Sequence, residues 1–322
     1  MIASPKRRLG LYAALALLLP ASLLLALSVG SSGWVWPASG DAALQRILLE
    51  LRLPRAIAAL IVGSLLATAG CLMQVLLRNP LADPYILGLS GGASVFALAG
   101  MSFGLTWLPT PLLAFGGALL TTVMVFLLAR GEGAWTSSRV LLTGVVMASG
   151  WGALISLILA TGSDTSLRGM LFWLMGDLSN SRVSVLWLLP TLLALFLIWL
   201  RARSLNVLSA GPVQAELLGE PIRVRFWEIF LAASLLTGIA VAMAGAIGFV
   251  GLIVPHLMRL LVGADHRRLL PAAAAFGASF LLIADTLART LISPRQLPVG
   301  VLTALIGVPL FLVLLRRARG IR

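Results

Sequence analysis

The chain alternates long apolar blocks with short polar segments. Charged or turn-forming residues bound each block, and most blocks contain about 20 residues, the number that a helix needs to cross the hydrocarbon of a bilayer. The nine blocks lie at about 11–29, 54–77, 86–104, 111–129, 139–160, 183–200, 228–262, 269–290 and 297–315. We therefore expect an all-α protein built from membrane-spanning helices.

The block at 228–262 is the exception to this pattern. It has 35 residues, too many for one helix, and the glycine-rich motif GAIGFVG at 245–251 lies near its middle. Arginines flank both ends, and basic residues tend to lie on the cytoplasmic side of a membrane protein. A helix that enters the membrane, breaks at the glycines and returns satisfies both observations. The sequence therefore predicts ten spans.

Charge supports this topology and places both termini in the cytoplasm. With ten spans, 17 of the 24 Lys and Arg residues lie inside and 7 outside, which is the expected bias. The block at 11–29 exceeds the roughly 7–15-residue core of a secretory signal, so we interpret it as the first span. On the outer side, the apolar motif LRGMLFWLMG within 161–182 is too short to cross. It predicts a short helix, either a lid or an interfacial helix.

Composition excludes an ordinary soluble domain. Only 11% of the residues are charged and the mean hydropathy is +1.04, whereas about a quarter of the residues in soluble domains are charged. The net charge of +13 comes from residues at the ends of apolar blocks, so it indicates membrane topology and lipid contact rather than a nucleic-acid partner. The single cysteine, Cys71, lies in an apolar run, where a small buried hydrophobe is the simpler interpretation than a reactive thiol.

The sequence lacks the main motifs of metalloproteases and nucleotide hydrolases. It contains no HExxH and no GxxxxGK[ST], so we expect that the chain is not an enzyme and does not hydrolyse nucleotide on its own. His256, His266 and Asp265 are the only candidates for a metal site, and solvated loop residues are the simpler interpretation. We expect no catalytic residues and no bound metal.

The largest polar segment runs from Arg201 to Glu228 and carries seven charges. Within it, Ser209 or Gly211 marks a helix start, with Pro212 at a first helical position and Gly219 at the helix end. A further helical turn begins at Pro221. A helical hairpin of this kind is either a docking element or a long connector.

Two other turns and one group of charges are candidate functional features. The turn RNPLADP at 78–84 is rigid because its prolines stop the preceding helix, and such a turn can narrow a pore. The turn WTSSR at 135–139 offers three hydroxyls that suit helix capping. Asp285 and Arg289 form an i,i+4 pair in which the costly intramembrane charge of Asp285 is neutralised. Arginines at an outer rim also suit a partner with carboxylates, and the two roles are compatible.

The motifs LRLPRAIAALIVG, RNPLADPYILGLSGGAS, LRGMLFWLMG, GAIGFVGLIVPHLMRLL, DHRRLLP and LPVGVLTALIGVPLF follow one another from about residue 50 to the C-terminus. In this order, the sequence resembles the permease subunits of bacterial ABC importers for iron chelates, haem and vitamin B12. The resemblance implies one permease domain over 1–322, with ten helices in the architecture of type II ABC importers. It also implies a homodimer in the bacterial inner membrane, two ATPase subunits that hold ATP and Mg, and a periplasmic binding protein. The chain itself would bind no cofactor.

The same resemblance assigns three sets of site residues. The loop at about 204–227 would dock on the ATPase through Leu208, Gly211, Ala215, Leu218 and Gly219. Two cytoplasmic gates would be formed by Asn79 and Leu81, and by Thr136, Ser137 and Ser138. The binding protein would dock on Arg52, Arg55 and Arg289.

The sequence leaves alternatives open for the cargo and for the energy source. The chain reads WTSS and RNP at its gates, where the vitamin B12 permease differs, so the sequence does not choose between a ferric siderophore, haem and cobalamin. The alternative function is an ion-coupled secondary transporter, which also uses broken helices. Such a carrier needs a polar coupling site near the middle of the membrane. Asp285 is the only acidic candidate within a span and lies toward the outer end.

Overall fold

A computed structural model describes residues 5–30, 33–34, 42–105, 107–129, 137–179 and 183–319. These residues are almost entirely helical, apart from a two-stranded hairpin of β1 (Val29–Gly30) and β2 (Gly33–Trp34). The α-helices are α1 (Pro5–Ser28), α2 (Ala42–Arg46), α3 (Leu53–Leu76), α4 (Leu89–Ser102), α5 (Thr110–Ala129), α6 (Ser137–Thr161), α7 (Asp164–Leu174), α8 (Leu188–Leu200), α9 (Ala202–Ala210), α10 (Pro212–Leu217), α11 (Ile222–Ala244), α12 (Val250–Val262), α13 (His266–Thr290) and α14 (Val299–Arg319). A π-helix (Ile47–Arg52) and two 3₁₀ turns (Pro84–Leu87 and Val185–Trp187) complete the elements.

Each of the ten predicted spans has a helical counterpart. Six segments of the described chain are long and apolar enough to cross a bilayer: α1, α3 with the turns before it, α5, α6, α11 and α13. Helix α8, with the 3₁₀ turn before it, reaches that length only when α9 is counted with it across a 50° bend, and α4, α12 and α14 are shorter apolar helices. The prediction of an all-α membrane protein is therefore confirmed.

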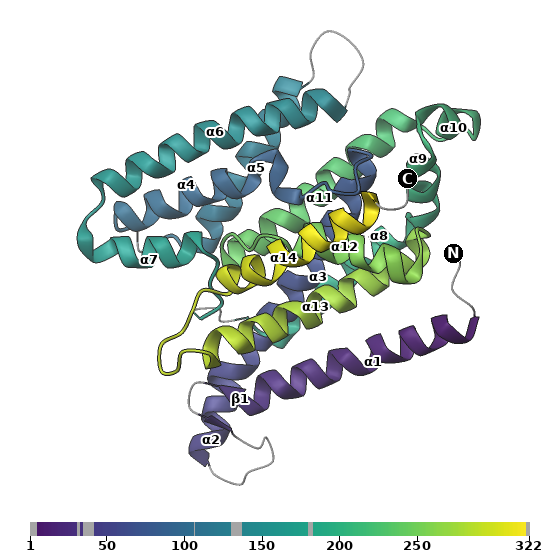
Figure 1. Cartoon of the computed structure of the whole chain (residues 1–322). Helices are drawn as coiled ribbons and strands as arrows, with labels where there is room; N and C mark the ends of the chain where they lie inside the picture. The colour runs from purple at the N-terminus through teal and green to yellow at the C-terminus, as the bar shows by residue number, and fades with distance from the viewer. Residues whose placement is uncertain are drawn as a thin grey trace.

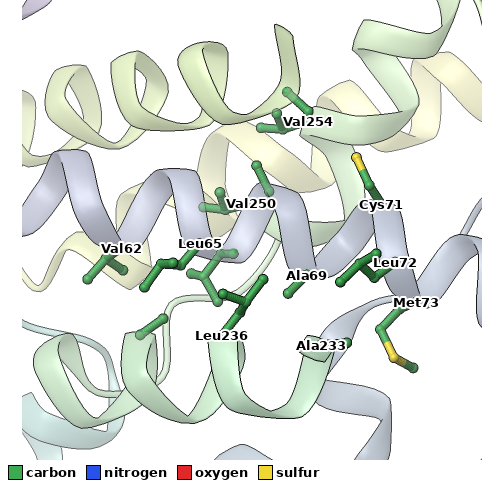
Figure 2. Close-up of a cluster of buried hydrophobic side chains, with 14 of the residues drawn as sticks. Val62, Leu65, Ala69, Cys71, Leu72, Met73, Ala233, Leu236, Val250 and Val254 are labelled. Carbon is green, nitrogen blue, oxygen red and sulfur yellow. The ribbon is translucent and has the colours of Figure 1, made fainter. Parts of the chain in front are cut away.

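Helix α3 lies at the centre of the bundle (Figure 1). It is apolar on all sides, and 94% of its most apolar window is buried, as expected for a helix surrounded by other helices. Figure 2 shows side chains of α3, among them Leu65 and Leu72, beside Leu236 of α11 and Val250 of α12. The remaining helices are arranged around this core.

Two pairs of glycines bring helices into backbone contact at α3. A Cβ added at Gly277 of α13 would meet the carbonyl oxygen of Gly63 at 2.5 Å, and one added at Gly63 would meet the carbonyl of Gly277. A Cβ at Gly70 would likewise collide with the carbonyl of Gly251 in α12. Membrane helices associate mainly through such close packing, because lipid is as apolar as their side chains.

We expect that Gly70→Ala lowers the free energy of unfolding in detergent by about 1–3 kcal/mol, because the added methyl group has no space against the carbonyl of Gly251. Gly116→Ala is the matched control, since the same substitution in α5 meets no atom within 4 Å and improves helix propensity by up to about 1 kcal/mol. Chemical unfolding followed by tryptophan fluorescence would measure both. Equal stabilities of the two variants would contradict the contact.

The predicted break in the seventh apolar block is present between α11 and α12. Gly245 ends α11 with a φ of 67°, a conformation that favours glycine. The backbone N–H of Ile247, inside the break, donates to the hydroxyl of Tyr85 at 3.0 Å. The predicted short helix at 161–182 is also confirmed as α7, whose last turn lies beside Gly245.

The bundle has two ends that matter for function. One carries α9 and α10, and we call it the hairpin end; the other carries β1 and α2 (Figure 1). Helix α13 connects them: it begins beside α9, where His266 N–H donates to Asn206 Oδ1 at 2.8 Å. It ends beside the C-terminus of α1, where Arg289 donates to Ala26 O at 3.2 Å.

Candidate functional site: a helical hairpin, two turns and a buried arginine cluster

The hairpin of α9 and α10 follows from glycine and proline placement. Gly211, with a φ of 122°, ends α9, and Pro212 is the first residue of α10. Gly219 has a φ of 75°, and α11 begins directly after Pro221. The start of α10 after Gly211, the turn at Gly219 and the start of α11 after Pro221 agree with the prediction, whereas Ser209 lies inside α9 and starts no helix. A valine at Gly219 would be strained by its backbone angle alone, because no atom lies within 4 Å of a Cβ added there.

Three large apolar side chains project from α10 and the turn after it. Val213 is 63% exposed, Leu217 81% and Leu218 69%. Val213 and Leu217 share one helix face, since they are four residues apart. Exposed apolar side chains this close together indicate a protein-contact surface. We call these three residues the apolar tip.

Two of the predicted coupling residues lie elsewhere in the hairpin. Ala215 is fully buried, and Leu208 of α9 is partly buried and packs against the main core. Both therefore shape the hairpin from inside, whereas Leu218 belongs to the apolar tip. The sequence reasoning missed Val213 and Leu217, although their i,i+4 spacing on a short polar helix was a signal that could have found them.

Polar contacts fix the base of the hairpin. Asn206 in α9 donates to Asp265 Oδ1 at 2.7 Å and accepts from the His266 backbone N–H at 2.8 Å. Its side-chain hydrogen bond lowers the pKa of the Asp265 carboxyl below the ordinary value. On the other side, Arg225 bridges Glu220 at 3.1 Å and Glu228 at 2.7 Å. The hairpin is thus tied both to α13 and to the start of α11.

The first predicted gate, at 78–83, is a rigid turn. Asn79 is exposed, and its side-chain oxygen accepts the backbone N–H of Leu81 at 2.9 Å. Asp83 closes the turn by accepting the Tyr85 N–H at 2.8 Å. Burial raises the pKa of the Asp83 carboxyl to about 6, although the Tyr85 N–H acts in the opposite direction. Leu81 is half-buried.

The second predicted gate is described in part. Thr136 lies outside the described residues, whereas Ser137 is the first residue of α6. The Ser137 hydroxyl donates to the carbonyl of Leu76 at 2.9 Å, so it joins the start of α6 to the end of α3. This contact differs from the predicted helix-capping role. It satisfies one of the carbonyls that a helix leaves unpaired at its C-terminus.

One cavity brings the second gate and the hairpin together. It has a volume of about 440 Å³, and Arg78, Ser137 and Ser138 line one part of it. Leu208 and Pro212 of the hairpin line another part, together with residues of α3 and α11. A displacement of the hairpin therefore changes the walls of a cavity that the gate shares. Asn79 and Leu81 are not among its lining residues.

The three predicted docking arginines form a buried cluster at the opposite end. Arg55 Nε and Nη2 lie 2.9 Å and 2.8 Å from Asp285 Oδ1, and Arg289 Nε lies 3.1 Å from Asp285 Oδ2. Arg55 also donates to Gln296 Oε1 at 2.8 Å. All three arginines and Asp285 are buried. The predicted Asp285–Arg289 pair is confirmed.

Backbone carbonyls hold the rest of the arginine cluster. Arg52 donates to Leu27 O at 2.7 Å, to Ser28 O at 2.8 Å and to Gly33 O at 3.2 Å, and Arg289 donates to Ala26 O. Three of these carbonyls belong to the last turn of α1, where a helix has no partners of its own. The arginines thus cap α1 from inside the protein. Docking of a binding protein on them stays a prediction, since the contacts seen here are internal.

The candidate metal residues are arranged differently from a metal site. Among the described residues, no three His, Cys, Asp or Glu side chains are grouped so that they could hold a metal ion. His266 Nδ1 lies 2.7 Å from Asn206 Oδ1. Asp265 caps α13 by accepting the Arg267 N–H at 3.1 Å.

Comparisons with known proteins agree with this arrangement. The FecCD transport family matches residues 16–317. The hemin transport system permease protein HmuU of Yersinia pestis is 42% identical over 88% of this chain and 87% of its own length. The vitamin B12 import system permease protein BtuC of Klebsiella pneumoniae is 40% identical over 95% and 93%. The uncharacterized ABC transporter permease protein YvrB of Bacillus subtilis is 46% identical over 88% and 82%.

Solved structures show the same fold. An inward-facing conformation of a metal-chelate type ABC transporter superposes with a TM-score of 0.86 and 34% identity, covering 98% of this chain and all of that one. PsaBC from Streptococcus pneumoniae shares only the fold, with a TM-score of 0.57 and 16% identity over 86% of this chain and 92% of its own. The chain therefore belongs to the FecCD transport family and is the membrane subunit of an ABC importer.

Proposed function

We propose that this permease forms a single domain and moves a metal chelate or tetrapyrrole, such as a ferric siderophore, haem or cobalamin, from the periplasm to the cytoplasm. The apolar tip of the hairpin carries this proposal, because Val213, Leu217 and Leu218 present apolar surface directly beside the cavity that Ser137 and Ser138 line. In this proposal the tip docks on an ATPase subunit, which holds ATP and Mg. The chain contributes the conduit and no catalytic group.

The exposed surface of α6 supports a homodimer with the conduit between the two copies. Only 11% of the most apolar window of α6 is buried. Ser149, Gly152 and Ser156 form a stripe of small exposed residues along it, the kind of surface on which membrane helices associate. Both serine hydroxyls donate back to carbonyls of their own helix at 3.0 Å. A wall of this kind offers a passing chelate few fixed hydrogen-bond partners.

The proposed topology places the hairpin end, both termini and both gates in the cytoplasm of a bacterial inner membrane. It then places the arginine cluster on the periplasmic side, where a binding protein delivers the cargo. The charge bias of the sequence supports this orientation.

The alternative function, an ion-coupled carrier, would need Asp285 as its coupling site. That carboxylate is held by Arg55 and Arg289, so it is not available to bind a coupling ion. Uptake of radiolabelled ferric siderophore, haem and cobalamin into proteoliposomes would test the proposal, with the ATPase and binding protein encoded beside this permease. We expect uptake of one of these cargoes that requires ATP hydrolysis. Uptake driven by a proton or sodium gradient without ATP would overturn it.

A further inference from the structure

An apolar groove at the hairpin end is not used by the transport mechanism. It has a volume of about 630 Å³ and lies between α8 on one side and α1, α3 and α13 on the other. Leu192, Leu195 and Phe196 line it from α8, and Ala274 and Ala275 from α13. Every residue of α8, all of them described, is at least partly exposed. The helix therefore stands away from the body of the protein along this groove.

The dimensions of the groove match one leaflet of a bilayer. Its lining extends from Leu188 to Trp199 along α8 and from Arg267 to Ala278 along α13, which corresponds to roughly 16 Å of helix. Half of the hydrocarbon thickness is about 15 Å. Most of its lining is apolar, so where the groove opens to the hydrocarbon of a membrane its natural filling is a lipid acyl chain.

One end of the groove is polar and positively charged. Arg267 lines the groove there, and Trp199 closes the same end by donating its indole N–H to the Arg267 carbonyl at 2.9 Å. Tryptophan and arginine are the residues that anchor proteins at the level of lipid headgroups. Arg267 and its neighbour Arg268 are exposed, and within the described residues neither forms an ion pair.

The position of these arginines on α13 favours an anion. They occupy the first turn of the helix, which contains no acidic residue in this described segment. The N-terminus of a helix carries a partial positive charge, so two arginines there repel it and one another unless an anion lies near. Asp265 supplies one carboxylate, which accepts from Asn206 and the Arg267 backbone N–H and also interacts with both arginines. One negative charge does not balance two arginines and the helix N-terminus.

We propose that this groove binds one acyl chain of an anionic phospholipid, with the headgroup phosphate on the Arg267 guanidinium. The acyl chain fills the space between α8 and α13 along one leaflet. The negative charge of the phosphate offsets the positive charges at the start of α13. The bound lipid then stabilises the packing of α8 on α1, α3 and α13, close to the point where α8 is followed by the hairpin. This inference does not depend on the cargo or on the ATPase.

Native mass spectrometry of the detergent-purified chain would test it, with phosphatidylglycerol and phosphatidylcholine of the same acyl chains added in equal amounts. We expect one retained phosphatidylglycerol and a preference of roughly fivefold over phosphatidylcholine, as one arginine near a headgroup provides. Arg267→Gln should abolish the preference. Arg268→Gln is the matched control, because it removes the same charge from the same turn but does not line the groove, and it should keep most of the preference.

A second variant tests the acyl-chain part of the site. Ala274→Leu adds apolar volume inside the groove without a polar change, so it should leave the fold intact and lower retention of both lipids. Equal retention of the two lipids by the wild-type chain would overturn the proposal. So would an equal effect of the two arginine variants, which indicates general surface charge, or unchanged retention by Ala274→Leu. Displacement of the lipid by inorganic phosphate alone would show an anion site without an acyl chain and would also overturn it.

Discussion

Replacing Asp285 by asparagine is expected to lower the free energy of unfolding by about 3–5 kcal/mol, because it leaves two buried arginines, Arg55 and Arg289, without their shared carboxylate. Asp285 contacts both Arg55 and Arg289 within 3.1 Å, and no other described acidic residue forms an ion pair with these arginines. Asparagine has nearly the same shape as aspartate, so the loss of stability would come from the missing charge and not from a cavity. Thermal unfolding in detergent and the yield of monodisperse protein would measure it.

Glu228→Gln is the control for this prediction. Glu228 also meets two arginines, Arg201 and Arg225, but it is 39% exposed, and exposed ion pairs contribute about 0–1 kcal/mol. A second test is Arg289→Leu in the Asp285→Asn background, which removes one of the unpaired positive charges and should recover part of the stability. If Asp285→Asn proved as stable as Glu228→Gln, the cluster would not be the electrostatic anchor described here.

The second large effect is expected at the apolar tip. Leu217→Glu should reduce binding of the ATPase subunit by about thirtyfold, since one contact residue of this kind contributes about 2 kcal/mol to an interface. Leu217 is 81% exposed, so its substitution should leave folding unchanged. Co-purification of the two subunits, and ATP-dependent uptake in proteoliposomes, would show the loss.

Trp107→Glu provides the matched control for the tip. Trp107 is 75% exposed and lies in the turn between α4 and α5, outside the hairpin. The Trp107→Glu variant should bind the ATPase as tightly as the wild-type chain does. Wild-type binding by Leu217→Glu, or an equal loss in the two variants, would argue against docking at the tip.

Local chemistry allowed the sequence to predict the helices and their ends. Gly211, Pro212 and Gly219 define the hairpin through backbone preferences that do not depend on the rest of the fold. The Asp285–Arg289 pair was predictable for the same reason, since four residues in a helix are one turn. The glycine break after α11 followed from the length of its apolar block.

Long-range contacts could not be predicted in this way. Arg55 meets a carboxylate 230 positions away, and Arg52 caps carbonyls of α1 that are 24 and 25 positions away. Nothing near Arg52 in the sequence indicates that α1 ends beside it. The burial of Ala215 and the exposure of Leu217 depend on how the hairpin folds back, which composition does not specify. Ser137 was expected to cap its own helix, and its partner on α3 became evident only once the helices were placed.

The hydrogen bond between Tyr85 and Ile247 has a consequence for movement during transport. Tyr85 follows the rigid turn at 78–83, and Ile247 lies in the break between two membrane helices. An amide left without an acceptor in this apolar interior costs several kcal/mol. The turn and the broken helix are therefore expected to move together. A motion that separates them requires another hydrogen-bond acceptor for the Ile247 N–H.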